Sequence, residues 1–208
     1  QGPHPDYRID VGDQILVSTW GQIEQELTTA VDPQGNIFLP GIGPIQVRGV
    51  SSGELSAHVE RQVRSVYREN VGVYATLANT RAIGVFVTGF VSRPGRYPGA
   101  PSESAIDFLA KAGGVDPNRG SYRDITILRN DRVIARVDLY DFLLAGRLPR
   151  VLFQEGDTIL VGQQRSLVTA EGDVRNNYRF EFPVDGPLTG AELIRLARPL
   201  PKATHARI

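Results

Sequence analysis

Alternating apolar and polar positions mark the strands in the first part of the chain. Gln14–Trp20 is rich in apolar and β-branched residues, and the apolar side chains from Val71 to Leu77 recur at every second position, so both segments are predicted to be strands. Asp32-Pro33-Gln34-Gly35 has the composition of a turn, which makes Asn36–Leu39 the predicted return strand. Extended structure is expected to resume at Ile45–Val47.

In the segment between the last two of these strands along the chain, the apolar residues follow the spacing of a helix. Leu55, Val59, Val63 and Val66 lie on one face of a predicted helix. Ser51 and Glu54 have the spacing of a capping box, which predicts that the helix begins just after Ser51.

The second part of the chain alternates strands with short helices. Strands are predicted at Val85–Thr88, around Tyr97, at Ile125–Leu128, at Val133–Val137 and at Ile159–Val161. Asn130-Asp131 is a hairpin signal. One helix is expected from about Ser104 to the Gly113-Gly114 pair, and a shorter one from Asp138 to Gly146. Strands and helices in this order predict an α+β fold in which a small sheet packs on one helix.

A half-copied repeat is the most informative feature of the sequence. Gly89-Phe90-Val91 returns as Gly172-Asp173-Val174, and an aromatic residue follows six positions after each valine, Tyr97 in one copy and Phe180 in the other. A short helix pattern follows each copy. Repeats of this size indicate one supersecondary unit used more than once, which is more typical of a modular scaffold than of an enzyme.

The sequence also carries signs of being a fragment. The second copy stops at Ile208, before the half that completes the first copy. Gln1-Gly2-Pro3 matches the end of an engineered protease site and is set aside. We therefore expect a longer protein whose secretion signal or anchor lies elsewhere.

Composition excludes several function classes. The 208 residues contain 23 basic and 23 acidic side chains, so bulk charge does not favour nucleic acid. Cysteine is absent, and His4, His58 and His205 form no metal-ligand spacing. No nucleotide-binding motif occurs, and we expect no metal or cofactor.

Two local features could carry chemistry. Gly49-Val50-Ser51-Ser52-Gly53 fits the pattern of a nucleophile elbow, but no suitable histidine follows, so we expect Ser51 to be only a helix cap. Trp20 is the sole tryptophan and could stack on a sugar, although packing in a small core is the interpretation that we favour. Asp13 and Asp157 share the pattern G-D-x-I-L-V, and we expect both to bond local backbone amides.

These motifs together resemble a known family. Tyr7–Asp13, Val17–Gly21, Val31–Ile37 and Leu39–Ile45 resemble the polysaccharide biosynthesis/export domain, and Val87–Tyr97 with Ala110–Val115 resembles the soluble-ligand-binding β-grasp module. In this order they are similar to bacterial outer-membrane polysaccharide export proteins. The family-motif positions, with expected structural roles, are Gly12, Asp13, Asp32, Gly35, Pro40, Gly43, Gly89, Pro94, Gly95, Tyr97, Gly113, Gly114 and Gly172.

The resemblance implies three domains and a non-enzymatic role. They are an export domain at 6–80, a first β-grasp module at 82–163 and a truncated second module at 166–208. Such proteins form homo-oligomeric rings in the periplasm at the outer membrane, pass capsular or extracellular polysaccharide, and couple to an inner-membrane co-polymerase and in some cases to an outer-membrane barrel. The second module departs from the pattern, because Ala197-Arg198-Pro199 replaces Ala112-Gly113-Gly114. The alternative is a monomeric β-grasp module that binds a small ligand for uptake.

Overall fold

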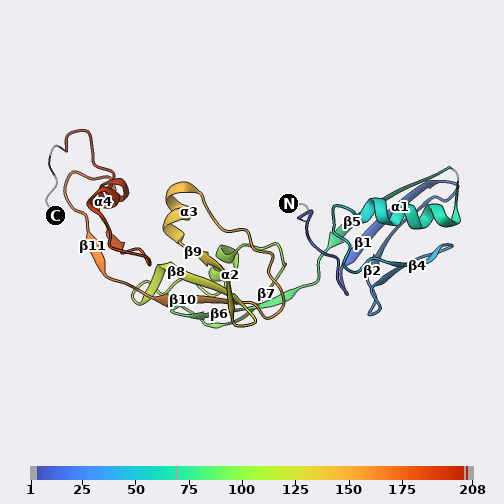
Figure 1. Ribbon diagram of the computed structural model, residues 1–208, viewed down its shortest axis with the longest axis horizontal. Coiled ribbons are helices and arrows are strands. Elements are labelled where there is room, and N and C mark those ends of the chain that lie inside the picture. The colour runs from blue at the N-terminus through green and yellow to red at the C-terminus, as the bar shows by residue number, and fades with distance from the viewer. Residues whose placement is uncertain (1–3, 69, 204, 206–208) are drawn as a thin grey trace. The chain divides into compact units, whose positions relative to one another are not determined.

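The computed structural model describes residues 4–68, 70–203 and 205, and it divides into two compact units. The first unit ends at Ile83 and includes 100–102, and the second comprises 84–99 and the residues from 103 onward. Figure 1 labels most of their helices and strands. Gln1-Gly2-Pro3 lies outside the described residues.

The first unit is built on a three-stranded antiparallel sheet of order β2-β1-β5. A separate hairpin and one helix complete it, and α1 packs on β5. The bounds are β1 (Gln14–Gly21), β2 (Gln25–Ala30), β3 (Asn36–Leu39), β4 (Gly43–Gln46), α1 (Leu55–Val66) and β5 (Val71–Asn79). Alternate residues of β1 and β5 and one face of α1 share a single core, which includes Ile15, Val17, Leu55, Val59 and Leu77. The predicted alternation of β1 and β5 is thereby confirmed.

Three expectations for this unit are wrong. The return strand beside β1 is β2, whereas Asn36–Leu39 pairs with β4. The helix begins after Glu54, and the Ser51 hydroxyl bonds the Glu54 carboxylate at 2.9 Å, so no capping box forms. Val66 is 53% exposed because it lies in the last turn of α1, beyond the residues that face β5.

The second unit contains a five-stranded mixed sheet of order β7-β6-β10-β8-β9. Its bounds are β6 (Ile83–Gly89), β7 (Gly95–Gly99), α2 (Ala105–Lys111), β8 (Gly120–Arg129), β9 (Arg132–Val137), α3 (Leu139–Ala145) and β10 (Thr158–Gln163). β10 pairs parallel with β6 and antiparallel with β8. Phe108 of α2 is fully buried and meets Phe153 edge-on at 5.0 Å. The predicted α+β class is confirmed.

The repeat is visible in the hydrogen bonds of the second copy. That copy consists of β11 (Leu167–Thr169), β12 (Arg179–Glu181) and α4 (Gly190–Ala197). The amides of Ser92 and Arg93 donate to the end of α2, at Gly114 O and Ala112 O. The corresponding amides of Arg175 and Asn176 donate to the end of α4, at Arg198 O and Ala197 O. Both copies thus tie the segment after the Gly-x-Val turn to the C-terminus of the following helix.

Candidate functional site

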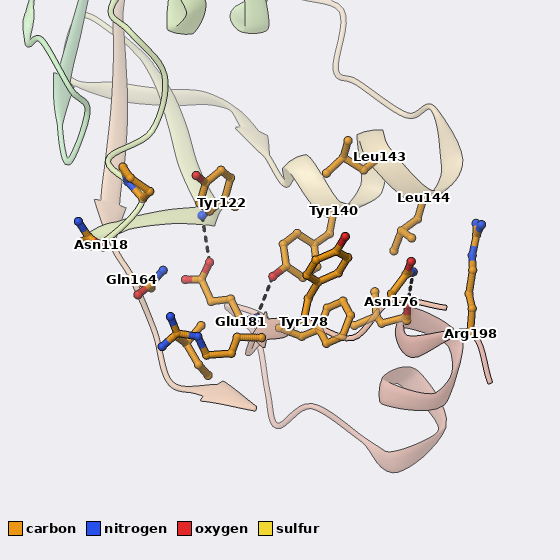
Figure 2. A pocket seen from close by; sticks show the side chains of 15 residues that line it. Asn118, Tyr122, Tyr140, Leu143, Leu144, Gln164, Asn176, Tyr178, Glu181 and Arg198 are labelled. Atoms are coloured by element: carbon orange, nitrogen blue, oxygen red, sulfur yellow. Dashed lines mark hydrogen bonds between the residues drawn. The ribbon is translucent and has the colours of Figure 1, made fainter. Parts of the chain in front are cut away.

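A pocket of about 680 Å³ lies where the second copy packs against the first module. Figure 2 shows Tyr140 and Tyr178 near its centre, Asn118 and Gln164 toward one end, and Asn176 and Arg198 toward the other. The lining residues are Pro117, Asn118, Tyr122, Tyr140, Leu143, Leu144, Gln164, Leu167, Asn176, Tyr178, Arg179, Phe180, Glu181, Leu196 and Arg198. This volume is typical of small-molecule sites.

The buried carboxylate of Glu181 fixes one wall of the pocket. Glu181 is 1% exposed, and its two oxygens accept hydrogen bonds from the amides of Tyr122 at 2.9 Å and Arg165 at 2.8 Å. The first amide belongs to β8 and the second to the segment that joins the copies. Glu181 therefore binds β12 to the first module, and both of its oxygens are already engaged.

Tyr140 of α3 presents a protonated phenol to the pocket. Its oxygen accepts the amide N–H of Glu181 at 2.8 Å, and its ring meets Phe180 edge-on at 6.5 Å. Burial raises the pKa of Tyr140 above its usual value of 10.0. The hydroxyl therefore stays protonated at neutral pH and can donate to a ligand.

Arg198 occupies a backbone position that favours glycine. It is the C-cap of α4, in the left-handed region with φ 51° and ψ 74°. In the first copy, the residues that follow the helix at the corresponding place are Gly113 and Gly114. Their φ angles are 80° and 83°. A left-handed conformation costs a non-glycine residue roughly 1–2 kcal/mol. The second copy thus places an arginine, at some cost, where the first copy has glycine.

The pocket carries two cationic side chains without a carboxylate partner. Arg179 and Arg198 line it, and in the described part of the chain neither guanidinium forms an ion pair. Two arginines of the first module are paired by contrast, Arg129 with buried Asp157 and Arg123 with Asp138.

Tyrosine rings, side-chain amides and guanidinium groups recognise a polar ligand through stacking and hydrogen bonds. They provide no nucleophile with an adjacent base. No group of three metal-ligating side chains occurs in the described ranges. The arrangement is therefore suited to binding.

The residues singled out from the sequence lie elsewhere. Gly12, Gly35, Gly43, Gly89, Gly113, Gly114 and Gly172 all have positive φ. Asp32 binds the amides of Gln34 and Asn36 in its turn, and Tyr97 donates to Arg93 O across the turn that contains Pro94 and Gly95. Pro40 follows β3, and its carbonyl accepts the Gln25 side chain at 3.4 Å. None of these residues lines the pocket.

Trp20 does not pack in the core, contrary to our expectation. It is 53% exposed at the end of β1, opposite Gly72 of β5. A Cβ at Gly72 would lie 2.0 Å from the indole, so the ring lies over the glycine backbone on the surface. A hollow of about 610 Å³ beside it is lined by Arg64, Tyr67 and Arg68 among others. A sugar contact at Trp20 stays a prediction.

Ser51 lacks the partners of a catalytic serine. It forms an isolated bridge with Arg8, and its hydroxyl bonds Glu54. His58 Nε2 instead lies 2.6 Å from Gln46 O.

The pocket residues were not predicted from the sequence, with one partial exception. The aromatic lining comes from β8, α3, β12 and the segment before β12, which are brought together by the packing of the two copies. Arg198 alone gave a signal, because the sequence around it departs from the repeat where the first copy has Gly-Gly.

Comparison with known proteins shows which class of protein the chain resembles. Residues 1–78 match the model of the polysaccharide biosynthesis/export protein family. The resemblance to polysaccharide export proteins is therefore confirmed.

Three curated relatives agree with this class. Two proteins of Escherichia coli called polysialic acid transport protein KpsD are 48% and 47% identical over 207 residues, which is all of this chain but only 37% of each relative. The exopolysaccharide production protein ExoF of Rhizobium meliloti (strain 1021) is 23% identical over 124 residues, or 53% of this chain and 28% of that protein. The chain thus spans little more than a third of the length of the KpsD relatives.

Proposed function

We propose that this chain is a non-enzymatic part of a machinery that exports capsular or extracellular polysaccharide. The observation that carries the proposal is the identity of 48% to a polysialic acid transport protein along the whole chain. The export domain at residues 1–78 and a pocket suited to polar ligands support it. In this role the chain lies in the periplasm, associated with the outer membrane, and polysialic acid or a related polymer is its cargo. Among the described residues, no helix has the length and hydropathy of a membrane span.

The export role includes assembly into a ring through the β-grasp modules. Phe86 of β6 and Leu160 of β10 are 44% and 37% exposed. Phe86 is opposite Thr158 and Leu160 is opposite Thr88, so all four side chains share the face of the sheet away from the buried valines. Exposed apolar side chains on one sheet face favour contact with another protein surface. An inner-membrane co-polymerase and an outer-membrane barrel are the further partners that we propose.

A second candidate is a β-grasp module that binds a small ligand for uptake. The single observation in its favour is the concave pocket of about 680 Å³. The export domain at residues 1–78 supports the export role instead.

An exchange experiment tests export directly. This chain would replace the matching segment of KpsD in an Escherichia coli strain that makes polysialic acid. We expect polymer at the cell surface, measured with a polysialic acid antibody on intact and on lysed cells. A Ser51→Ala chimera is the matched control for hydrolysis and should export equally. Polymer retained inside cells that hold a normal amount of the chimera would contradict the proposal.

A further inference from the structure

The pocket combines features of a site for a charged sugar. The ring of Tyr178 offers a flat apolar face and is 66% exposed, whereas the Tyr140 ring has the Arg123 guanidinium over it, 4.7 Å from the ring centroid. Around the rings lie the amides of Asn118, Gln164 and Asn176. Asn176 donates Nδ2 to Leu196 O at 2.7 Å, which fixes the side chain. A pyranose has both apolar faces and hydroxyl groups, so stacking surfaces flanked by amides suit its recognition.

The charge of the pocket favours a sugar that carries a negative group. Its lining contains two arginines and one carboxylate. That carboxylate, Glu181, already accepts two backbone amides, whereas Arg179 and Arg198 have no ion-pair partner in the described part of the chain. A planar guanidinium binds a carboxylate through two parallel hydrogen bonds. A neutral sugar has no carboxylate to accept these two hydrogen bonds.

The backbone of Arg198 supports a functional role for its side chain. The corresponding positions of the first copy are glycines, which adopt the left-handed region without strain. Strain retained at a position where a glycine would relieve it is a feature of functional sites.

We propose that this pocket binds a carboxylate-bearing sugar unit of the exported polymer, with Arg198 as the partner of the carboxylate. Tyr178 stacks on the ring, and the side chains of Asn118, Gln164 and Asn176 bond hydroxyl or acetamido groups. The inference rests on the proposed export function and names the chemistry of the cargo and the place where it is held.

Calorimetric titration of the purified chain tests this inference. The probes are short oligomers of sialic acid and of galacturonic acid, each paired with the same oligomer after its carboxyl groups have been reduced to alcohols. We expect at least one acidic oligomer to bind, and its reduced form to bind about tenfold or more weakly, since a charge-assisted hydrogen bond is worth that factor. Equal binding of the acidic and reduced forms, or no binding of either acid, would overturn the proposal.

Variants test whether Arg198 is the residue that binds the carboxylate. Arg198→Asn keeps a side chain that tolerates the left-handed region, so the fold should persist while affinity for the acidic oligomer falls about tenfold. Arg198→Lys should recover part of the affinity. The matched control is Arg195→Asn, which removes the same charge from the last turn of α4, outside the pocket. Equal losses in Arg198→Asn and Arg195→Asn would show a general charge effect and would overturn the assignment.

The binding and exchange experiments fail independently. A chimera that exports polymer while the purified chain ignores acidic sugars would keep the export function and remove this inference. A chain that binds acidic oligomers through Arg198, in a chimera that does not export, would keep the binding site and remove the export function.

Discussion

Two buried aspartates perform the same task in the two units. Asp13 is fully buried and accepts the amides of Asp10 at 2.9 Å and Arg81 at 2.8 Å. Asp157, 1% exposed, accepts the amide of Gln154 at 2.8 Å and pairs with Arg129. Both carboxylates bond the residue three positions before them, as the shared G-D-x-I-L-V pattern predicted. A hydrogen bond of this kind can be predicted from sequence, because the aspartate and the amide that it accepts are close neighbours along the chain.

Arg198 gives a prediction in which stability and binding change in opposite directions. Arg198→Gly should raise the free energy of unfolding of the second unit by about 1 kcal/mol, because glycine adopts the left-handed region without strain. The same change should weaken binding of an acidic sugar. Urea unfolding followed by circular dichroism measures the first effect.

The first unit and the first copy provide controls for this measurement. Trp20 is the only tryptophan and belongs to the first unit, so its fluorescence transition should be unchanged. Gly113→Ala should destabilise, because φ is 80° and the new Cβ would lie 3.0 Å from Ser92 Cβ. A less stable Arg198→Gly protein would contradict the strain argument.

Local capping signals predicted the ends of α3 but not the start of α1, where Glu54 and not Ser51 is the N-cap. Asp138 accepts the Tyr140 amide and Gly146 has φ 65°, so α3 begins and ends as its sequence predicted. β2 was missed because its sequence, Gln25–Ala30, is mostly polar and none of its residues is buried. Pairing with β1 orders it, together with packing of Leu27 against the core, and long-range pairing leaves no local pattern.

Glu181 is the main polar link between β12 and the first module. Glu181→Ala should leave the amides of Tyr122 and Arg165 without acceptors, and each unsatisfied buried amide costs about 1–3 kcal/mol. We expect these two amides to exchange hydrogen much faster, together with the β11–β12 hairpin.

Hydrogen exchange read by NMR or mass spectrometry checks this expectation. Glu171→Ala, which removes an exposed carboxylate from the same copy, is the control and should change little. Unaltered protection of Tyr122 and Arg165 in the Glu181→Ala protein would show that the carboxylate is not needed to hold the hairpin.

At the scale of the whole molecule, the pocket was beyond sequence analysis. Its lining extends from Pro117 to Arg198 and takes residues from both copies of the repeat. The class of protein was nevertheless predictable, because turns and strand ends occur in the family's order along the chain. The order of motifs along the chain can be read directly from the sequence, whereas contacts between side chains far apart in the sequence cannot.

The exposed sheet face gives a prediction about assembly. Phe86→Glu should abolish self-association, because a charge on this face would have to be desolvated in any subunit contact. Sedimentation over a range of concentrations should give a mass above the monomer for the unmodified chain and a monomer for the variant. Phe38→Glu, which alters a phenylalanine that is 61% exposed in the first unit, is the control. A variant with the mass of the unmodified chain would contradict contacts through this face.

The parallel pairing of β6 with β10 also has a consequence for folding kinetics. Phe86 is opposite Thr158, so this contact closes a loop of 72 residues. Such non-local pairing slows folding, since the entropy of loop closure is lost before the contact forms. During synthesis, one side of β6 remains without its partner until β10 has emerged. We therefore expect the five-stranded sheet to form late in biogenesis, with β6 as the segment most in need of protection by a chaperone.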